Sequence, residues 1–191
     1  MNLRNRATLC AVSALLFAAT ASAGDATAFD LAKQGNQYVG NESKDKIVQI
    51  RSEKSVASLT PNIWYVVYYD PDATFKSVEV KFGGGQKIGV SHPWRAIEPV
   101  TGNDRVLEHS HLKIDSDRAL KIAQEQPLLK NLTLKASQLT LGHGDEGPVW
   151  EVKFWAAKLS HPNENADIGR VIISADSGSV VKTDLHPNSV D

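Results

Sequence analysis

The chain has 191 residues, a formal net charge of −1 at pH 7 and a single cysteine, Cys10. This near-neutral balance gives no electrostatic reason to expect a nucleic acid or an anionic membrane surface as the partner. A single cysteine excludes a disulfide within the chain, so the fold has to rest on its hydrophobic core.

The first 23 residues have the three-part layout of a secretory signal peptide. Arg4 and Arg6 precede an apolar run over residues 9–19, and residues 21–23 are Ala-Ser-Ala. A membrane anchor would need about 18 or more apolar residues, and this run is shorter. We therefore expect cleavage after Ala23 and a mature protein that is periplasmic or secreted.

Cleavage at that position would also remove the only thiol of the chain. Cys10 follows Leu9 and not a small residue, so we do not expect it to carry a lipid. The mature chain would have no cysteine nucleophile and no thiolate ligand for zinc. No later segment is apolar for long enough to span a bilayer.

The first candidate elements follow in the order helix, strand, strand, strand. A helix is predicted over residues 29–38, although Gly35 lowers its propensity by about 1 kcal/mol relative to alanine. β-Branched and aromatic residues predict strands over 47–51, 63–68 and 78–82. Residues 83–85 are three glycines, and because no helix follows them we predict a hairpin turn, not a phosphate-binding loop.

Residues 91–114 are predicted to form a link. Pro93 and Pro99 favour an extended chain, and Gly102 adds a further break in secondary structure.

The same order of elements then recurs. Asp115 or Ser116 is predicted to cap a helix in which apolar residues recur at helical spacing. Alternation over residues 132–136 predicts a strand, which Leu139 and Leu141 continue in the opposite phase. Further strands are predicted over 149–154 and 171–175, each bounded by turn residues.

This repetition predicts an α+β fold of two tandem modules, residues 28–90 and 115–186. Each module would be a helix packed on a small antiparallel sheet, in the order helix-strand-strand-strand. The connections are too short for parallel crossovers, which need a dozen or more residues.

The second half resembles the PepSY family, named for peptidase propeptides. The resemblance is carried by residues 117–123 at the start of the helix, 148–154 in the middle strand and 171–181 at the last hairpin. Its sharpest feature is the turn Asp176-Ser177-Gly178, and the first half departs from it with its three glycines. The resemblance implies a small extracytoplasmic binding module that restrains a peptidase or acts as a local regulator.

Catalysis is not expected, because the sequence has no G-x-S-x-G, H-E-x-x-H or Walker motif. No cofactor is expected either. The alternative to a protein-binding role is a metal or small-ligand carrier that uses His109 and His111. On a strand these two rings would share one side, with Glu108 as a possible oxygen donor, but a pair supplies only half of a tetrahedral zinc site.

The leading contact residues are Tyr65, Val67 and Tyr69. They alternate with the apolar set of Trp64, Val66 and Tyr68, so this strand is apolar on both faces. The link, the other module or a second copy in a homodimer could cover the extra face. Otherwise it is a recognition surface for a protein partner, such as a peptidase.

Overall fold

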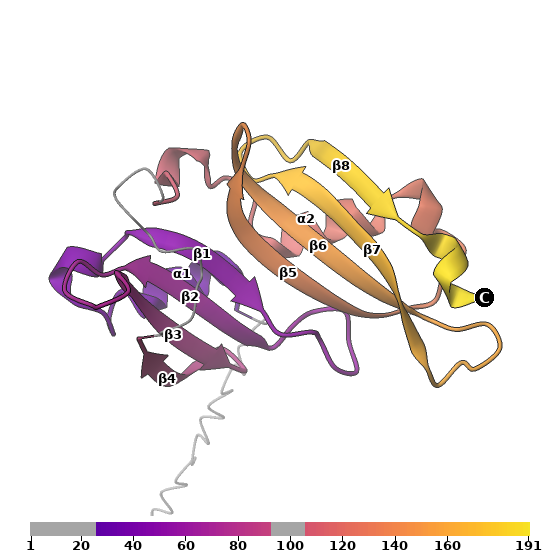
Figure 1. Ribbon diagram of the computed structural model, residues 1–191, viewed down its shortest axis with the longest axis horizontal. Coiled ribbons are helices and arrows are strands. Elements are labelled where there is room, and N and C mark those ends of the chain that lie inside the picture. Colours follow the sequence, from indigo (N-terminus) through magenta and orange to yellow (C-terminus); the bar gives the residue numbers. More distant parts are fainter. Residues whose placement is uncertain (1–25, 93–105) are drawn as a thin grey trace, which may run out of the picture.

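The computed structural model of the protein describes residues 26–92 and 106–191 (Figure 1). The predicted signal peptide, residues 1–23, lies outside the described residues, as do residues 93–105 of the predicted link. None of the helices in the two described ranges is long and apolar enough to cross a membrane.

The strands form one eight-stranded antiparallel sheet in the order β4-β3-β2-β1-β5-β6-β7-β8. Their bounds are β1 (Ile47–Ser52), β2 (Ile63–Tyr69), β3 (Ser77–Gly83), β4 (Gln86–Ser91), β5 (Leu134–Gly144), β6 (Gly147–Ala157), β7 (Asn165–Ser174) and β8 (Val180–Leu185). The helices are α1 (Ala28–Gly35) and α2 (Ser116–Gln124), with short 3-10 turns η1 (Asn41–Ser43), η3 (His109–His111), η4 (Pro127–Leu129) and η5 (Pro187–Val190).

The prediction of two separate helix-on-sheet modules is wrong. The described residues form mostly one continuous sheet with only two short helices, and each half contributes four strands instead of three. The fourth strand of the first half, β4, follows a tight turn at Gly84 and Gly85, whose positive φ angles of 57° and 77° suit glycine. The sequence predicted this turn and did not assign the short exposed strand that follows it.

Both helices lie behind the sheet in Figure 1, so they cover the same face. Helix α1 contacts β1 and β2, whereas α2 contacts β6 and β7. One hydrophobic core runs beneath both, and its largest fully buried side chains include Trp150, Tyr68 and Phe82. A continuous core is the physical reason why the two halves do not separate into modules.

The two halves meet where β1 pairs with β5. Backbone pairing joins Ile50 to Leu141 and Arg51 to Thr140. Beyond these pairs, buried serine hydroxyls replace the backbone acceptors. Ser52 Oγ accepts from the N–H of Leu139 at 2.9 Å, and Ser55 Oγ accepts from the N–H of Ser137 at 2.9 Å. These bonds satisfy buried N–H groups that the diverging strands would otherwise leave unpaired.

In residues 132–141 the apolar residues change from even to odd positions, and a β-bulge explains this change. Strand β5 is continuous, and a register shift between Leu134 and Ala136 marks a bulge against β6. A bulge adds one residue to one strand, so the alternation of side chains changes phase without ending the strand.

Candidate functional site on the sheet

The face of the sheet opposite the helices, here called the open face, carries charged and aromatic side chains. Cross-strand pairing aligns one row of this face over all eight strands, and neighbours in such a row project to the same side. The row contains Gly89, Lys81, Tyr65, Arg51, Thr140, Glu151, Ile172 and Lys182.

Tyr65 lies in the row between two cations. The guanidinium carbon of Arg51 is 4.1 Å from the centre of its ring, and Nζ of Lys81 is 4.8 Å from it. The hydroxyl of Tyr65 donates to Glu53, which follows β1. A ring held between two cations and tied at its tip has little freedom left to lose when a partner binds.

The same contacts set the protonation states around Tyr65. Hydrogen bonds from Tyr65 and from Lys81 hold the pKa of Glu53 below its usual value. Bonding to Tyr65 and Glu53 raises the pKa of Lys81. Both groups therefore stay ionised at neutral pH, and because both are well exposed to solvent, their ion pair contributes little to folding stability.

The other two predicted contact residues are less accessible. Val67 is fully buried at 0% exposure, where it forms a small cluster with Val48 and Tyr69. Tyr69 is half-buried, and Nζ of Lys46 lies 5.8 Å from its ring centre. In this conformation, only Tyr65 and Tyr69 of the predicted set present surface to a partner.

Trp155 is an open-face aromatic residue that the sequence did not single out as a contact residue. It is half-buried in β6, opposite Asp167, and Lys54 and Lys153 lie over its ring at 4.3 Å and 5.1 Å. The sequence feature that places Trp155 on the open face is its position next to the core residue Phe154, since neighbours on a strand face opposite sides.

Two consecutive residues connect the aromatic side chains of the two halves. Glu53 accepts from the Tyr65 hydroxyl, while the next residue, Lys54, lies over the ring of Trp155. The segment that follows β1 thereby brings Tyr65 and Trp155 to the same part of the open face, next to the β1–β5 junction.

Ion pairs surround the two rings. Arg51 pairs with Glu79, whose side chain is only 9% exposed. Lys153 pairs with Asp167 at 2.6 Å. Although partial burial acts to raise the pKa of Asp167, the hydrogen bonds from Lys153 and from the N–H of Gly169 lower it below its usual value. The open face is thus a preorganised pattern of alternating charges.

The two candidate metal ligands do not share a site. His109 and His111 lie in η3 and not on a strand, so their rings do not align on one side. Nε2 of His109 is 2.9 Å from the backbone oxygen of Asp45, while Nδ1 of His111 is 3.0 Å from Asp176. Within residues 26–92 and 106–191, no group of three or more histidine, cysteine or acidic side chains could hold a metal ion.

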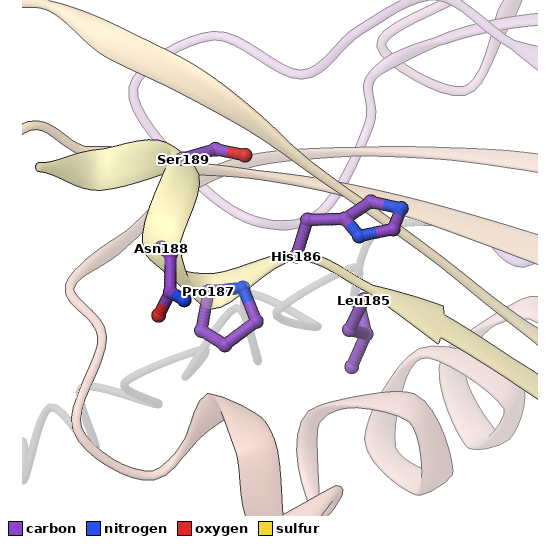
Figure 2. A pocket seen from close by; sticks show the side chains of 5 residues that line it. All are labelled: Leu185, His186, Pro187, Asn188 and Ser189. Carbon is purple, nitrogen blue, oxygen red and sulfur yellow. The ribbon is translucent and has the colours of Figure 1, made fainter.

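Hollows on the described surface differ in the titratable side chains that line them, and one of about 280 Å³ is lined by Glu108, His111, His143 and Glu146 among others. One of about 380 Å³ is lined by five consecutive residues, Leu185 to Ser189, and Figure 2 shows their side chains pointing in different directions. Another, of about 340 Å³, lies beside α1 and includes Lys33, Asp45 and His109 among its lining residues.

No protein-family model matches the chain, and no characterised protein or solved structure is significantly similar to it. The resemblance to the PepSY family therefore stays a prediction from the quoted motifs. The function has to be argued from the open face itself.

Proposed function

We propose that this is a non-catalytic binding protein that acts outside the cytoplasm and recognises a folded protein with the open face of its sheet. The observation that carries the proposal is that Tyr65 and Trp155, each with two cations over its ring, are contacted by the consecutive residues Glu53 and Lys54.

Interface energetics favour this interpretation. Tyrosine, tryptophan and arginine are the residue types that contribute most to protein–protein binding energy, and they do so from the centre of the interface. Here Arg51 lies over the ring of Tyr65, and the consecutive residues Glu53 and Lys54 contact Tyr65 and Trp155. The salt bridges fix the side chains before binding, which lowers the entropy that association costs.

The charge pattern defines the kind of partner. The open face alternates Arg51, Lys81 and Lys153 with Glu53, Glu79 and Asp167. A partner surface of a single charge sign would be repelled by the like charges of this pattern. A protein surface with charges of both signs can complement it. A peptidase is the partner class implied by the resemblance, and its inhibition would be the regulatory outcome.

The test compares a double variant with a matched control. Exported proteins of the native host would be passed over the purified protein, and the affinity of a captured partner then measured by calorimetry. Tyr65→Ala with Trp155→Ala should weaken binding at least about thirtyfold, because loss of one central aromatic residue costs about 2 kcal/mol. Tyr38→Ala removes an exposed tyrosine that has its own lysine contact, outside the open face, and should bind as the wild type does.

Equal binding by the double variant and the control would contradict the proposal, provided that both variants melt as cooperatively as the wild type. If the partner is a peptidase, its activity should fall when it is titrated with the wild-type protein. The double variant should then fail to inhibit it at the same concentration.

A further inference from the structure

The outer edge of β8 has a sequence that is complementary to itself. Strand β8 is the last strand of the sheet, its first four residues are exposed, and Val181 is 59% exposed. Residues 181–185 read Val-Lys-Thr-Asp-Leu. If two copies run antiparallel with Thr183 facing Thr183, each Lys182 lies opposite Asp184 of the other copy, and the register shift at Val181 falls outside these pairs.

The hydrogen-bonding phase of β8 fits this register. The N–H of His186 donates to the oxygen of Ile168 on β7 at 2.8 Å, and Asp184 and Lys182 follow at two-residue intervals opposite Arg170 and Ile172. Backbone groups in a strand alternate sides, so those of Thr183 and Leu185 point away from β7. Two copies can therefore exchange N–H···O bonds between their Thr183 residues at the symmetry axis.

The same phase places the charged pairs where side chains come closest. Lys182 and Asp184 flank the hydrogen-bonded pair at the axis, so they would occupy non-hydrogen-bonded positions, with Cα atoms about 4.5 Å apart. Lys182 belongs to the open-face row. A lysine on an exposed edge usually opposes strand pairing, but an aspartate two residues later converts self-pairing into two favourable ion pairs.

The other free end of the sheet does not have this property. Strand β4 carries one charged residue, Lys87, so an antiparallel pair of β4 strands would form no ion pair. The C-terminal turn η5 contacts β7 and so leads away from the outer edge of β8. Its Val190 oxygen accepts from the N–H of Leu159, in the loop between β6 and β7.

We propose that the protein self-associates through β8, by two-fold antiparallel pairing centred on Thr183. The axis is perpendicular to the sheet, so both copies keep their helices on one side and their open faces on the other. The two sheets become one, and two open faces are presented side by side. The contact is a single strand pair, so we expect a weak dimer that depends on protein concentration.

A charge exchange tests the register. Sedimentation would be measured up to about 1 mM protein, where weak contacts are populated. Lys182→Glu puts Glu opposite Asp184, and Asp184→Lys puts Lys opposite Lys182, so each variant alone should be monomeric. An equimolar mixture should dimerise at least as well as the wild type, because every opposing pair in the mixed dimer is again of opposite sign. A wild type that stays monomeric, or a mixture that stays monomeric, overturns the proposal.

Crosslinking gives an independent check in a Cys10→Ser background, which has no other thiol. Thr183→Cys brings two thiols together at the axis, where Cα atoms about 5.5 Å apart suit a disulfide. Lys182→Cys places its thiols two residues out of register. Val56→Cys places them at a residue that is 82% exposed and lies far from β8 in the sequence. Mild oxidation should link Thr183→Cys much faster than either control. Equal rates in all three variants would show random collision and overturn the proposal.

Discussion

The backbone N–H of Phe29 donates a hydrogen bond to Oδ1 of Asp115 at 3.1 Å, although the two residues belong to different halves of the protein. The same oxygen accepts from the N–H of Ser116 at the start of α2. Beside it, Ser116 Oγ accepts from the N–H of Ala28 at 3.0 Å. Asp115 thus caps α2 and, together with Ser116, supplies acceptors at the N-terminus of α1, whose own N-cap is Thr27.

Replacement of Asp115 tests this shared cap. Asp115→Ala should lower the free energy of unfolding by about 2 kcal/mol, because an N-cap loss costs about 1 kcal/mol and here a second helix also loses an acceptor. Asp115→Asn keeps an oxygen at the same position and should lose much less. Urea denaturation followed by far-UV circular dichroism measures both. Two separate unfolding transitions in the wild type would contradict the single core.

Trp150 provides a second test, on the core of the second half. Its side chain is fully buried, and its Nε1–H donates to the oxygen of Ile114 at 2.7 Å. Trp150→Ala should cost about 3 to 5 kcal/mol, as large-to-small changes in a core do. Trp150→Phe keeps most of the ring and loses the hydrogen bond, so it should cost less. Trp64→Ala is expected to behave like Trp150→Ala, since Trp64 is 3% exposed.

Gly35 should reverse the usual effect of a glycine-to-alanine change. Helix propensity alone predicts that Gly35→Ala stabilises the protein by about 1 kcal/mol. A Cβ atom there, however, would lie 2.1 Å from the hydroxyl oxygen of Tyr68. We expect Gly35→Ala to destabilise the fold by about 1 to 3 kcal/mol through overpacking.

Tyr68→Phe removes the atom that the new methyl group would meet, so the cost of Gly35→Ala should shrink in a Tyr68→Phe background. A thermal or urea double-mutant cycle measures this coupling. Independent, additive effects of the two changes would mean that helix α1 does not approach β2 as closely as described.

Tyr68 also makes stability fall at alkaline pH. Its hydroxyl donates to the oxygen of Ala32 at 2.6 Å inside the core, and burial, helped by the charge of Asp45, raises its pKa. In the unfolded chain this tyrosine ionises at about pH 10, while the folded protein keeps it protonated at that pH. Its contribution is therefore complete below pH about 10 and is lost as the pH rises further.

The measurement is the free energy of unfolding between neutral pH and about pH 11. Tyr68→Phe should be less stable than the wild type at neutral pH by about 1 kcal/mol, because a buried hydrogen bond is lost. It should also lose stability more slowly above pH about 10. Parallel curves for the two proteins would contradict the assigned cause.

Local patterns in the sequence predicted six of the eight strands of the described residues and the starts of both helices, because alternation and capping act between near neighbours. They did not predict that β1 pairs with β5, since strand pairing over such a separation leaves no local period. The residues at this junction are polar: Ser52, Ser55 and Ser137 are each at most 4% exposed, yet serine in a sequence usually marks a loop.

The candidate site was predicted in part for a similar reason. Tyr65 stood out because both faces of its strand are apolar. Trp155 did not, because its relation to Tyr65 depends on Glu53 and Lys54, which reach the two rings from one segment. The alternation in the sequence places Val67 on the same side of the strand as Tyr65. Its burial, however, depends on tertiary packing.

The shared helix cap has a consequence for how the protein is made. The acceptors for Ala28 and Phe29 lie 88 and 86 residues later in the chain. A ribosome therefore releases the whole first half before the groups that complete α1 have been synthesised. Folding of the first half ahead of the second is therefore disfavoured, and α1 should be completed only once the second half has emerged.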